Sequence, residues 1–308
     1  MSSTRLLPTV IEDLACPRCK HPLRKVDRCD GCGAEFATAA NLPVLIDFDD
    51  SICVPDDFKA AEIVQPGGNP SAIGKLLQRM TFGTSEASSG NIARFANLVA
   101  KEGGRRVLVV GGGTEGIGTE PLYGHPRLET VATDIYPGLG VAIVCDGHSL
   151  PFTEGSFDGV LIQAVLEHVL EPQRVVNEIE RVLKPDGLVY AETPFLQAVH
   201  MGAYDFTRFT KSGHRWLFRR FTEIDSGTVL GPGVVALWSI NHLFASAFGR
   251  KAAALLTAPF FWLRFLDLGA GDRARADGAS ALYFLGRRRD PGLKPSTMRE
   301  YYAGPAGN

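Results

Sequence analysis

The central part of the chain alternates between short apolar runs and amphipathic stretches. Residues 91–104 place Ile92, Phe95 and Val99 on one face of a helix, and this stripe ends at a glycine pair. An amphipathic helix is expected over 172–187, and apolar runs of strand length lie at 105–113, 128–137, 141–147, 157–169 and 188–195. This alternation predicts a parallel sheet with helical crossovers, in which ligands bind at the carboxyl ends of the strands.

The C-terminal third is the most apolar part of the chain. Residues 234–268 hold two apolar stretches, which Arg250 and Lys251 separate. A membrane-spanning helix needs about 20 apolar residues, and Asn241 and His242 interrupt the first stretch. We expect helices that complete the core or form a homodimer interface. The alternative is an apolar substrate pocket or a shallow lipid contact through 234–268, because exposed apolar helices with basic ends bind membrane surfaces.

Composition is that of an ordinary soluble globular protein. Of the 308 residues, 45% are hydrophobic and 21% are charged, and the formal net charge is −2. The first 60 residues hold 7 basic and 10 acidic side chains, which is unlike the basic footprint of a nucleic-acid-binding module. The N-terminus lacks the basic stretch and apolar run of a signal peptide. We expect a cytoplasmic protein, with peripheral membrane attachment as the alternative.

Four of the six cysteines form two Cys-x-x-Cys pairs near the N-terminus. Cys16 and Cys19 make the first pair, and nine residues separate it from Cys29 and Cys32. Two such turns present four thiolates to one tetrahedral Zn²⁺ at about 2.3 Å and leave no open position. The sequence therefore predicts a structural zinc ion that supplies much of the folding energy of this segment. Redox-active or merely reduced thiols are the alternative.

These patterns divide the chain into five segments. We expect a zinc ribbon at 1–50, an acidic linker rich in Pro and Gly at 51–70, and a ligand-binding α/β core at 71–230. Residues 231–289 are expected to complete the fold with apolar helices and a strand, and residues 290–308 to form a flexible tail.

A glycine-rich turn follows the first predicted strand of the core. Gly111, Gly112 and Gly113 stand at the carboxyl end of this strand, with a helix expected behind them. Dinucleotide enzymes, flavoproteins and methyltransferases all use such a turn, and a plain tight turn is the remaining alternative. Asp134 ends the next strand about twenty residues on, where a carboxylate accepts both ribose hydroxyls. Asp146 ends the third strand, where a carboxylate can meet an adenine amino group.

In combination, "VLVVGGGTEGIG", "ATDIYPG", "VCDGHSLPF" and "SFDGVLIQAVLEHVLEPQRVVNEIERVLKPDGLVYAETPF" resemble class I S-adenosylmethionine-dependent methyltransferases of the small-molecule type. The resemblance covers 105–225 and implies a Rossmann-like α/β fold with a seven-stranded sheet whose final strand is reversed. Residues 229–238 or 279–288 are the candidates for the late strands. The resemblance implies S-adenosylmethionine as cofactor, with Asp134 on the ribose and Asp146 on adenine. The cofactor-binding residues expected from it are Gly111, Gly112, Gly113, Asp134, Ile135, Asp146, Gly147 and Gln163.

The chain departs from the family pattern at two positions. The family often carries an acid two positions before the first glycine, where this chain has Val109, and Glu115 stands where a third glycine is usual. These departures keep a non-catalytic cofactor-binding scaffold open as an interpretation. The run 14–47 resembles small bacterial zinc-ribbon proteins related to the tRNA methyltransferase activator, with Asn41 where a glycine is more usual.

A long segment rich in aromatic and polar residues follows the fifth predicted strand. Insertions at this edge of such sheets commonly carry substrate contacts. The expected acceptor contacts are Asp205, Arg208 and His214. His200 and Tyr204 are the first candidates for a general base, with bracing of the loop as the equal alternative. His168, in the turn after the fourth strand, is the third candidate, and its alternative role is to cap a helix.

The sequence thus predicts methyl transfer from S-adenosylmethionine to a small-molecule, sugar-linked or lipid-linked acceptor, at oxygen or nitrogen. Alignment and desolvation carry most of such a displacement, and a base is needed only for a hydroxyl or a protonated amine. An RNA methyltransferase that uses the ribbon for recognition is one alternative, and the missing basic character speaks against it. A scaffold that binds the cofactor without turnover is the other.

Overall fold

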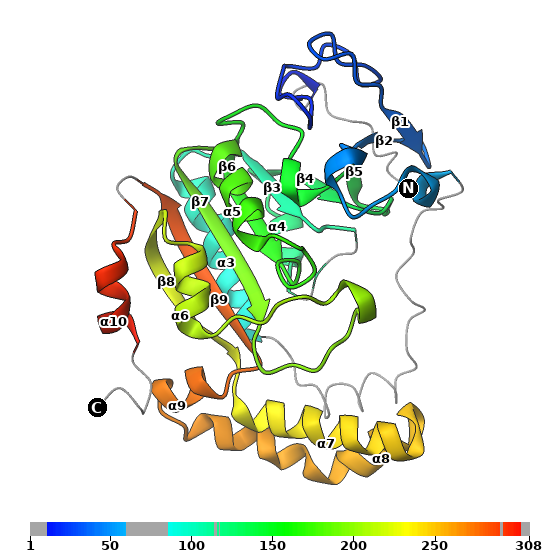
Figure 1. Cartoon of the computed structure of the whole chain (residues 1–308). Coiled ribbons are helices and arrows are strands. Elements are labelled where there is room, and N and C mark those ends of the chain that lie inside the picture. The colour runs from blue at the N-terminus through cyan, green and yellow to red at the C-terminus, as the bar shows by residue number, and fades with distance from the viewer. Residues whose placement is uncertain (1–10, 60–85, 114–115, 117, 290–291, 303–308) are drawn as a thin grey trace.

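The computed structural model describes residues 11–59, 86–113, 116, 118–289 and 292–302. A mixed sheet forms its centre, with the strand order β1-β2-β5-β4-β3-β6-β7-β9-β8 (Figure 1). The strands are β1 Ala37–Ala39, β2 Leu42–Leu45, β3 Arg106–Val110, β4 Glu129–Asp134, β5 Val141–Cys145, β6 Phe157–Gln163, β7 Leu183–Pro194, β8 Phe221–Leu230 and β9 Ala281–Arg288. The α-helices are α3 Glu86–Lys101, α4 Glu120–Tyr123, α5 Pro172–Val182, α6 Lys211–Leu217, α7 Pro232–Phe248, α8 Arg250–Thr257, α9 Asp272–Asp277 and α10 Met298–Tyr301.

The predicted α/β core is confirmed, and most of its strands pair in parallel. Strands β5, β4, β3, β6 and β7 are parallel neighbours, while β9 runs antiparallel to both β7 and β8. The seven strands from β5 to β8 therefore form a Rossmann-like sheet with one reversed strand. That strand is the predicted 279–288 segment. The other candidate segment, 229–238, instead closes β8 and then begins α7 at Pro232, because proline suits the first turn of a helix.

Alternating side chains of the central strands build two separate cores. In β3, Leu108 and Val110 are buried in a cluster that includes the apolar face of α5, whereas Val107 and Val109 belong to a cluster that includes Phe95 of α3. This division follows from the two-residue period of a strand, since successive side chains point to opposite faces. The sheet is thus covered on both faces, as its continuous apolar runs require.

The N-terminal segment joins this sheet instead of standing apart from it. Strand β2 pairs parallel with β5, and β1 pairs antiparallel with β2. Residues 51–59, predicted as linker, are packed structure, because Cys53 and Phe58 are buried against Val44 and Val141. The 3₁₀ turns η1 Phe48–Asp50 and η2 Pro55–Phe58 shape this segment. The rest of the predicted linker, together with Glu115, lies outside the described residues.

The apolar segment 234–268 forms a helical layer at the end of the molecule opposite the ribbon (Figure 1). Helix α7 packs on α8 and on the 3₁₀ segment η5 Ala258–Leu268. None of the described helices combines the length and the hydropathy needed to cross a bilayer. Many large apolar side chains of this layer are exposed, among them Leu243, Phe248, Leu255, Trp262, Phe265, Leu266 and Leu268.

The described part of the predicted flexible tail, residues 292–302, packs against the core. Helix α10 docks through Tyr301, whose hydroxyl lies 3.1 Å from Ser226 Oγ. The Arg215 guanidinium stands 5.9 Å from the centre of the same ring. A hydrogen bond and a cation–π contact therefore fix a segment whose glycine- and proline-rich sequence favoured a loose chain.

His214, predicted to touch the acceptor, lies in the core instead. Its ring packs edge-on against Phe218 with centroids 5.2 Å apart, and it also faces Phe284. Its Nε2 atom has no hydrogen-bond partner among the described residues. Burial lowers the pKa of His214 to about 3. The helical periodicity of α6 turned this residue inward, which its position on a polar segment did not reveal.

We predict that His214→Phe makes unfolding less sensitive to acid. Between pH 7 and pH 5 the unfolded chain binds a proton at this imidazole that the folded chain does not, so stability falls as the pH falls. Removing the group should reduce that loss by about 2 kcal/mol. Urea unfolding of both proteins at the two pH values measures the difference. Equal acid sensitivity of variant and parent would show that the His214 imidazole takes up a proton as readily in the folded protein as in the unfolded chain.

Candidate functional site

The four cysteines converge at the N-terminal end of the chain. Cys16 Sγ lies 3.7 Å from Cys32 Sγ, and Cys19 Sγ lies 3.6 Å from Cys29 Sγ. All four sulfur atoms lie within 4.8 Å of one another. Tetrahedral zinc with bonds of about 2.3 Å needs sulfur atoms about 3.8 Å apart. The observed spacing matches this value, so the predicted ligand set fits a Cys₄ zinc site.

Both cysteine turns have the same backbone construction. The amide of Lys20 donates to the carbonyl of Cys16, and the amide of Gly33 donates to the carbonyl of Cys29, each over 2.9 Å. Lys20 and Gly33 both have positive φ angles, 61° and 75°. A left-handed residue after each pair lets the chain reverse tightly and aim two thiolates at one point.

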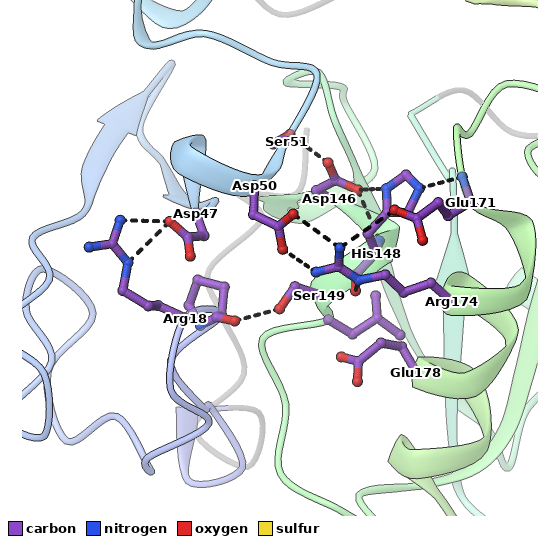
Figure 2. A network of polar contacts seen from close by, with 12 residues as sticks. Arg18, Asp47, Asp50, Ser51, Asp146, His148, Ser149, Glu171, Arg174 and Glu178 are labelled. Atoms are coloured by element: carbon purple, nitrogen blue, oxygen red, sulfur yellow. Dashed lines mark hydrogen bonds and ion pairs between the residues drawn. The ribbon is translucent and has the colours of Figure 1, made fainter.

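Polar contacts fasten this ribbon to the core beside α5 (Figure 2). Lys20 Nζ contacts Glu178 Oε2 at 2.8 Å and donates to Ser149 Oγ at 2.6 Å. Farther along the chain, Asp50 forms an ion pair with Arg174 of α5. Residues 48–53, which include Asp50, are called the strap below. It leads directly to the main cavity of the molecule.

A cavity of about 480 Å³ opens at the carboxyl ends of β3, β4 and β5. Six predicted cofactor residues line it: Gly111, Gly113, Asp134, Ile135, Asp146 and Gly147. Gly111 has φ = 78°, and a Cβ atom there would lie 2.1 Å from the Val165 side chain. No other residue fits this position, so the turn depends on glycine. The strap contributes Ile52 to the same cavity wall.

Two predicted cofactor residues serve packing instead of lining this cavity. A Cβ atom on Gly112 would meet Ala132 at 2.8 Å, so this glycine lets the turn approach β4. Gln163 directs its amide nitrogen to Glu192 Oε2 at 2.8 Å. Both residues are therefore adjacent to the site without forming its surface.

Asp134 holds the glycine turn in place. Its carboxylate accepts hydrogen bonds from the amide of Gly113 at 2.8 Å and from the amide of Tyr136 at 3.1 Å. Burial raises the pKa of Asp134, and the backbone donors oppose that shift. The side chain thus links the end of β4 to the end of β3, where a ribose is expected.

Asp146 is the meeting point of the core and the strap. Ser51 Oγ donates to Asp146 Oδ2 at 2.5 Å, and the His148 amide and Nδ1 contact Asp146 Oδ1 at 2.9 and 2.6 Å (Figure 2). His148 Nε2 accepts from the amide of Glu171, so the ring proton resides on Nδ1. Burial pushes the pKa of Asp146 upward, but the His148 and Ser51 hydrogen bonds outweigh it and lower the pKa.

The other wall of the cavity carries the residues predicted for the acceptor. His168, His200 and Tyr204 line it, and His168 Nδ1 contacts the carbonyl of Tyr204 at 2.7 Å. Asp205 and Arg208 form an ion pair behind His200, and the Asp205 carboxylate accepts from the His200 amide at 3.0 Å. Arg208 lowers the pKa of Asp205. Five of the six predicted catalytic or acceptor residues therefore lie together, and His214 does not.

Two polar residues at this site, Ser51 and His148, were missed by sequence reasoning, whereas Glu167 stood beside His168 among its candidates, with helix capping as the alternative for both. Glu167 is fully buried next to His168, and burial raises its pKa to about 7. Ser51 lay in a predicted linker, and His148 carried no pattern of its own.

Comparisons with known proteins agree with this geometry. Residues 108–191 match the family model described as a methyltransferase domain. The matched residues run from β3 to β7 and include the glycine turn, Asp134 and Asp146. The chain is also similar to a demethylmenaquinone methyltransferase of Renibacterium salmoninarum, at 38% identity over 120 residues, 34% of this chain and 50% of that protein.

Other similar proteins match this chain over comparably short stretches. An uncharacterized methyltransferase of Mycobacterium sp. (strain JLS) is 41% identical over 98 residues, which cover 28% of this chain and 37% of that protein. The chain therefore spans between about a third and a half of the length of these curated relatives. A solved structure of the Burkholderia thailandensis 1,6-didemethyltoxoflavin-N1-methyltransferase is 17% identical with a TM-score of 0.42, and covers 74% of this chain and 94% of its own.

We predict that Asp134→Ala weakens binding of S-adenosylmethionine by about 1–3 kcal/mol. The substitution removes a charged acceptor and also releases the Gly113 amide that it orders. Calorimetric titration measures the change. Asp134→Asn, which keeps the shape and one accepting oxygen, should lose less. Asp49→Ala serves as the control, since this surface carboxylate is 83% exposed. An unchanged dissociation constant in Asp134→Ala would remove this residue from the cofactor site.

Proposed function

We propose that the protein transfers a methyl group from S-adenosylmethionine to a small-molecule acceptor. The observation that carries the proposal is the continuity of one cavity. Asp134 and the glycine turn lie on one wall, and His168, His200 and Tyr204 lie on the other. Its volume of about 480 Å³ is in the range of small-molecule sites. A cofactor and an acceptor bound there would share a boundary inside the molecule.

The cofactor, when bound, supplies a methyl group on a positively charged sulfur, which is already an activated leaving group. The residues of the chain then have three tasks. The glycine turn and Asp134 hold the donor side, and the apolar wall of Val110, Ile135 and Val165 excludes water. The acceptor side aligns the attacking atom, which carries most of the rate enhancement in a single displacement.

A proton must leave only when the acceptor is a hydroxyl or a protonated amine. His200 and Tyr204 remain the first candidates for this base, and His168 is the third. Tyr204 is 42% exposed at the rim of the cavity and His200 projects from the same loop. This placement supports contact with the acceptor and leaves either role, base or brace, to the experiment below.

The alternatives differ in what they require of the chain. An RNA substrate would need a basic approach to the cavity, whereas the strap beside it carries Asp49 and Asp50, with Asp47 directly before it. A scaffold would bind the cofactor and show no turnover. Support for the small-molecule acceptor comes also from relatives named demethylmenaquinone methyltransferases, in Renibacterium salmoninarum and in Clavibacter sepedonicus. A lipid contact and a homodimer interface through 234–268 stay predictions. The exposed apolar side chains of this segment offer a surface for either one.

We also propose that Cys16, Cys19, Cys29 and Cys32 hold a structural zinc ion. The sulfur spacing supports it, and the thiolates of a folded Cys₄ site are otherwise close enough to repel one another. The ion would keep the ribbon folded, and the ribbon carries β2 and the strap onto the cofactor cavity.

We predict that Cys32→Ser lowers the zinc content by one equivalent per chain and lowers the melting temperature. Cofactor affinity should fall as well, because a loosened ribbon withdraws Ile52 from the wall of the cavity. Elemental analysis and calorimetry measure the two effects. Arg28→Ala, an exposed substitution in the same ribbon, is the control. Equal zinc content in variant and parent would refute the assignment.

We predict turnover when the protein is incubated with methyl-labelled S-adenosylmethionine and a metabolite extract. Mass spectrometry should show one labelled product and a matching amount of S-adenosylhomocysteine. With that acceptor, His200→Ala and Tyr204→Phe should keep cofactor affinity within about twofold, and loss of a base should lower turnover about 10²-fold. Tyr302→Phe, at an exposed tyrosine that bonds Asp277, is the matched control. Cofactor binding without any labelled product would favour the scaffold.

A further inference from the structure

A buried carboxylate without a donor marks the acceptor wall. Glu167 is 0% exposed, and neither of its carboxylate oxygens accepts a hydrogen bond from another of the described residues. An isolated carboxylate in such a place loses its hydration without compensation, which is among the costliest arrangements in a protein interior. It therefore calls for a proton or a cation beside it.

The two nearest side chains offer lone pairs and no donor. His168 Nδ1 faces the carbonyl of Tyr204 at 2.7 Å, so the proton of the neutral ring resides on Nδ1. His200 Nδ1 likewise faces two acceptors, the Ala198 carbonyl at 3.4 Å and Asp205 Oδ2 at 3.5 Å. Both Nε2 atoms then carry lone pairs, and they point at each other across 3.0 Å.

The three free ligand atoms have the spacing of a metal site. His168 Nε2 and His200 Nε2 lie 3.5 and 3.9 Å from Glu167 Oε1, and 3.0 Å from each other. Ligands at about 2.0–2.2 Å from a tetrahedral ion stand about 3.3 Å apart. The observed distances of 3.0, 3.5 and 3.9 Å bracket this value, and the longest exceeds it by about 0.6 Å. Their convergence thus needs only small side-chain adjustments.

We propose that Glu167, His168 and His200 bind a divalent transition-metal ion of the zinc class, with its fourth position open to the cavity. The outer contacts are those of a built site, because ligating histidines usually donate their second nitrogen to a carbonyl or a carboxylate. The Tyr204 carbonyl serves His168 in this way. Asp205, held by Arg208, is the partner of His200. Three protein ligands and one open position are typical of catalytic zinc.

The role of this ion rests on the proposed methyl transfer. An acceptor hydroxyl in the open position would ionise more readily, since the ion stabilises the oxygen anion. Its proton leaves to solvent, and a bond forms between its oxygen and the methyl carbon. The bond between that carbon and sulfur breaks, and its electron pair stays on sulfur. The ion would thus replace a side-chain base.

The competing explanation is a hydrogen bond between the two imidazoles, with Glu167 protonated. This explanation requires one of the two rings to carry its proton on Nε2. The Nδ1 atom of that ring would then direct a lone pair at an oxygen that can only accept a hydrogen bond. The two explanations differ in the metal content of the purified protein.

The test counts metal ions in the tag-free full-length protein. After equilibration with Zn²⁺ and desalting, elemental analysis should find two ions per chain in the parent, one of them in the cysteine ribbon. Glu167→Gln and His200→Ala should each hold one. His242→Ala, an exposed histidine on α7, should hold two. The full-length protein that holds zinc only in its ribbon is then titrated with Co²⁺. A second site should appear without thiolate-to-metal charge transfer. Its affinity for Co²⁺ should be at least about 100-fold weaker in both ligand variants.

Unchanged cofactor affinity in Glu167→Gln confirms that the variant is folded. Equal metal content in all four proteins, whether one ion or two, would overturn the proposal. Failure of the proposed function gives a different result, since the second ion would then bind in a protein that transfers no methyl group. Methyl transfer by a parent that holds only the ribbon zinc would leave the function standing and refute the second site.

Discussion

The parallel pairing of β5, β4, β3 and β6 is the constraint on which the rest of the molecule depends. Parallel neighbours end at one edge of the sheet, so residues far apart in the sequence arrive at a common surface. Gly111, Asp134 and Asp146 each follow a different strand and line the same cavity. The turn after β6 brings Glu167 and His168 to that edge, and the loop after β7 brings His200 opposite them. Neither wall of this cavity could form in an antiparallel sheet, because neighbouring strands would then end at opposite edges.

The ribbon and the α/β core form one continuous structure. Sheet pairing between β2 and β5 and the buried cluster around Cys53 and Phe58 fix the ribbon's orientation. The strap then runs over the end of β5, where Ser51 takes up one oxygen of Asp146. The adenine-reading role expected of Asp146 and its observed role as an anchor for the strap therefore compete for the same carboxylate. A bound adenine would have to share Asp146 with Ser51 or displace it.

Sequence reasoning recovered what depends on local pattern. The period-two apolar runs gave the strands, and the paired cysteines gave a ligand set whose sulfur atoms do converge. The glycine turn and the carboxylates of Asp134 and Asp146 were found because the fold rule fixes where such residues stand. Contacts between residues far apart in the chain could not be predicted in this way. Ser51 stood at the start of a predicted linker, and the acidic residues before it, Asp49 and Asp50, pair with Arg18 and Arg174, which lie elsewhere in the chain. His214 looked polar and accessible, and only the packing of α6 on β9 turns it inward.

The pairing of β2 with β5 has a consequence for the behaviour of the protein at high concentration. Without the ribbon, β5 would be the outer strand of the sheet, and a row of unpaired backbone groups beside Val141 and Ile143 would be open to strands of other chains. The ribbon covers that edge and then ends the sheet with β1, which has only three residues. Short outer strands are poor templates for intermolecular pairing. The four-cysteine ribbon thus also protects the edge of the sheet against intermolecular strand pairing.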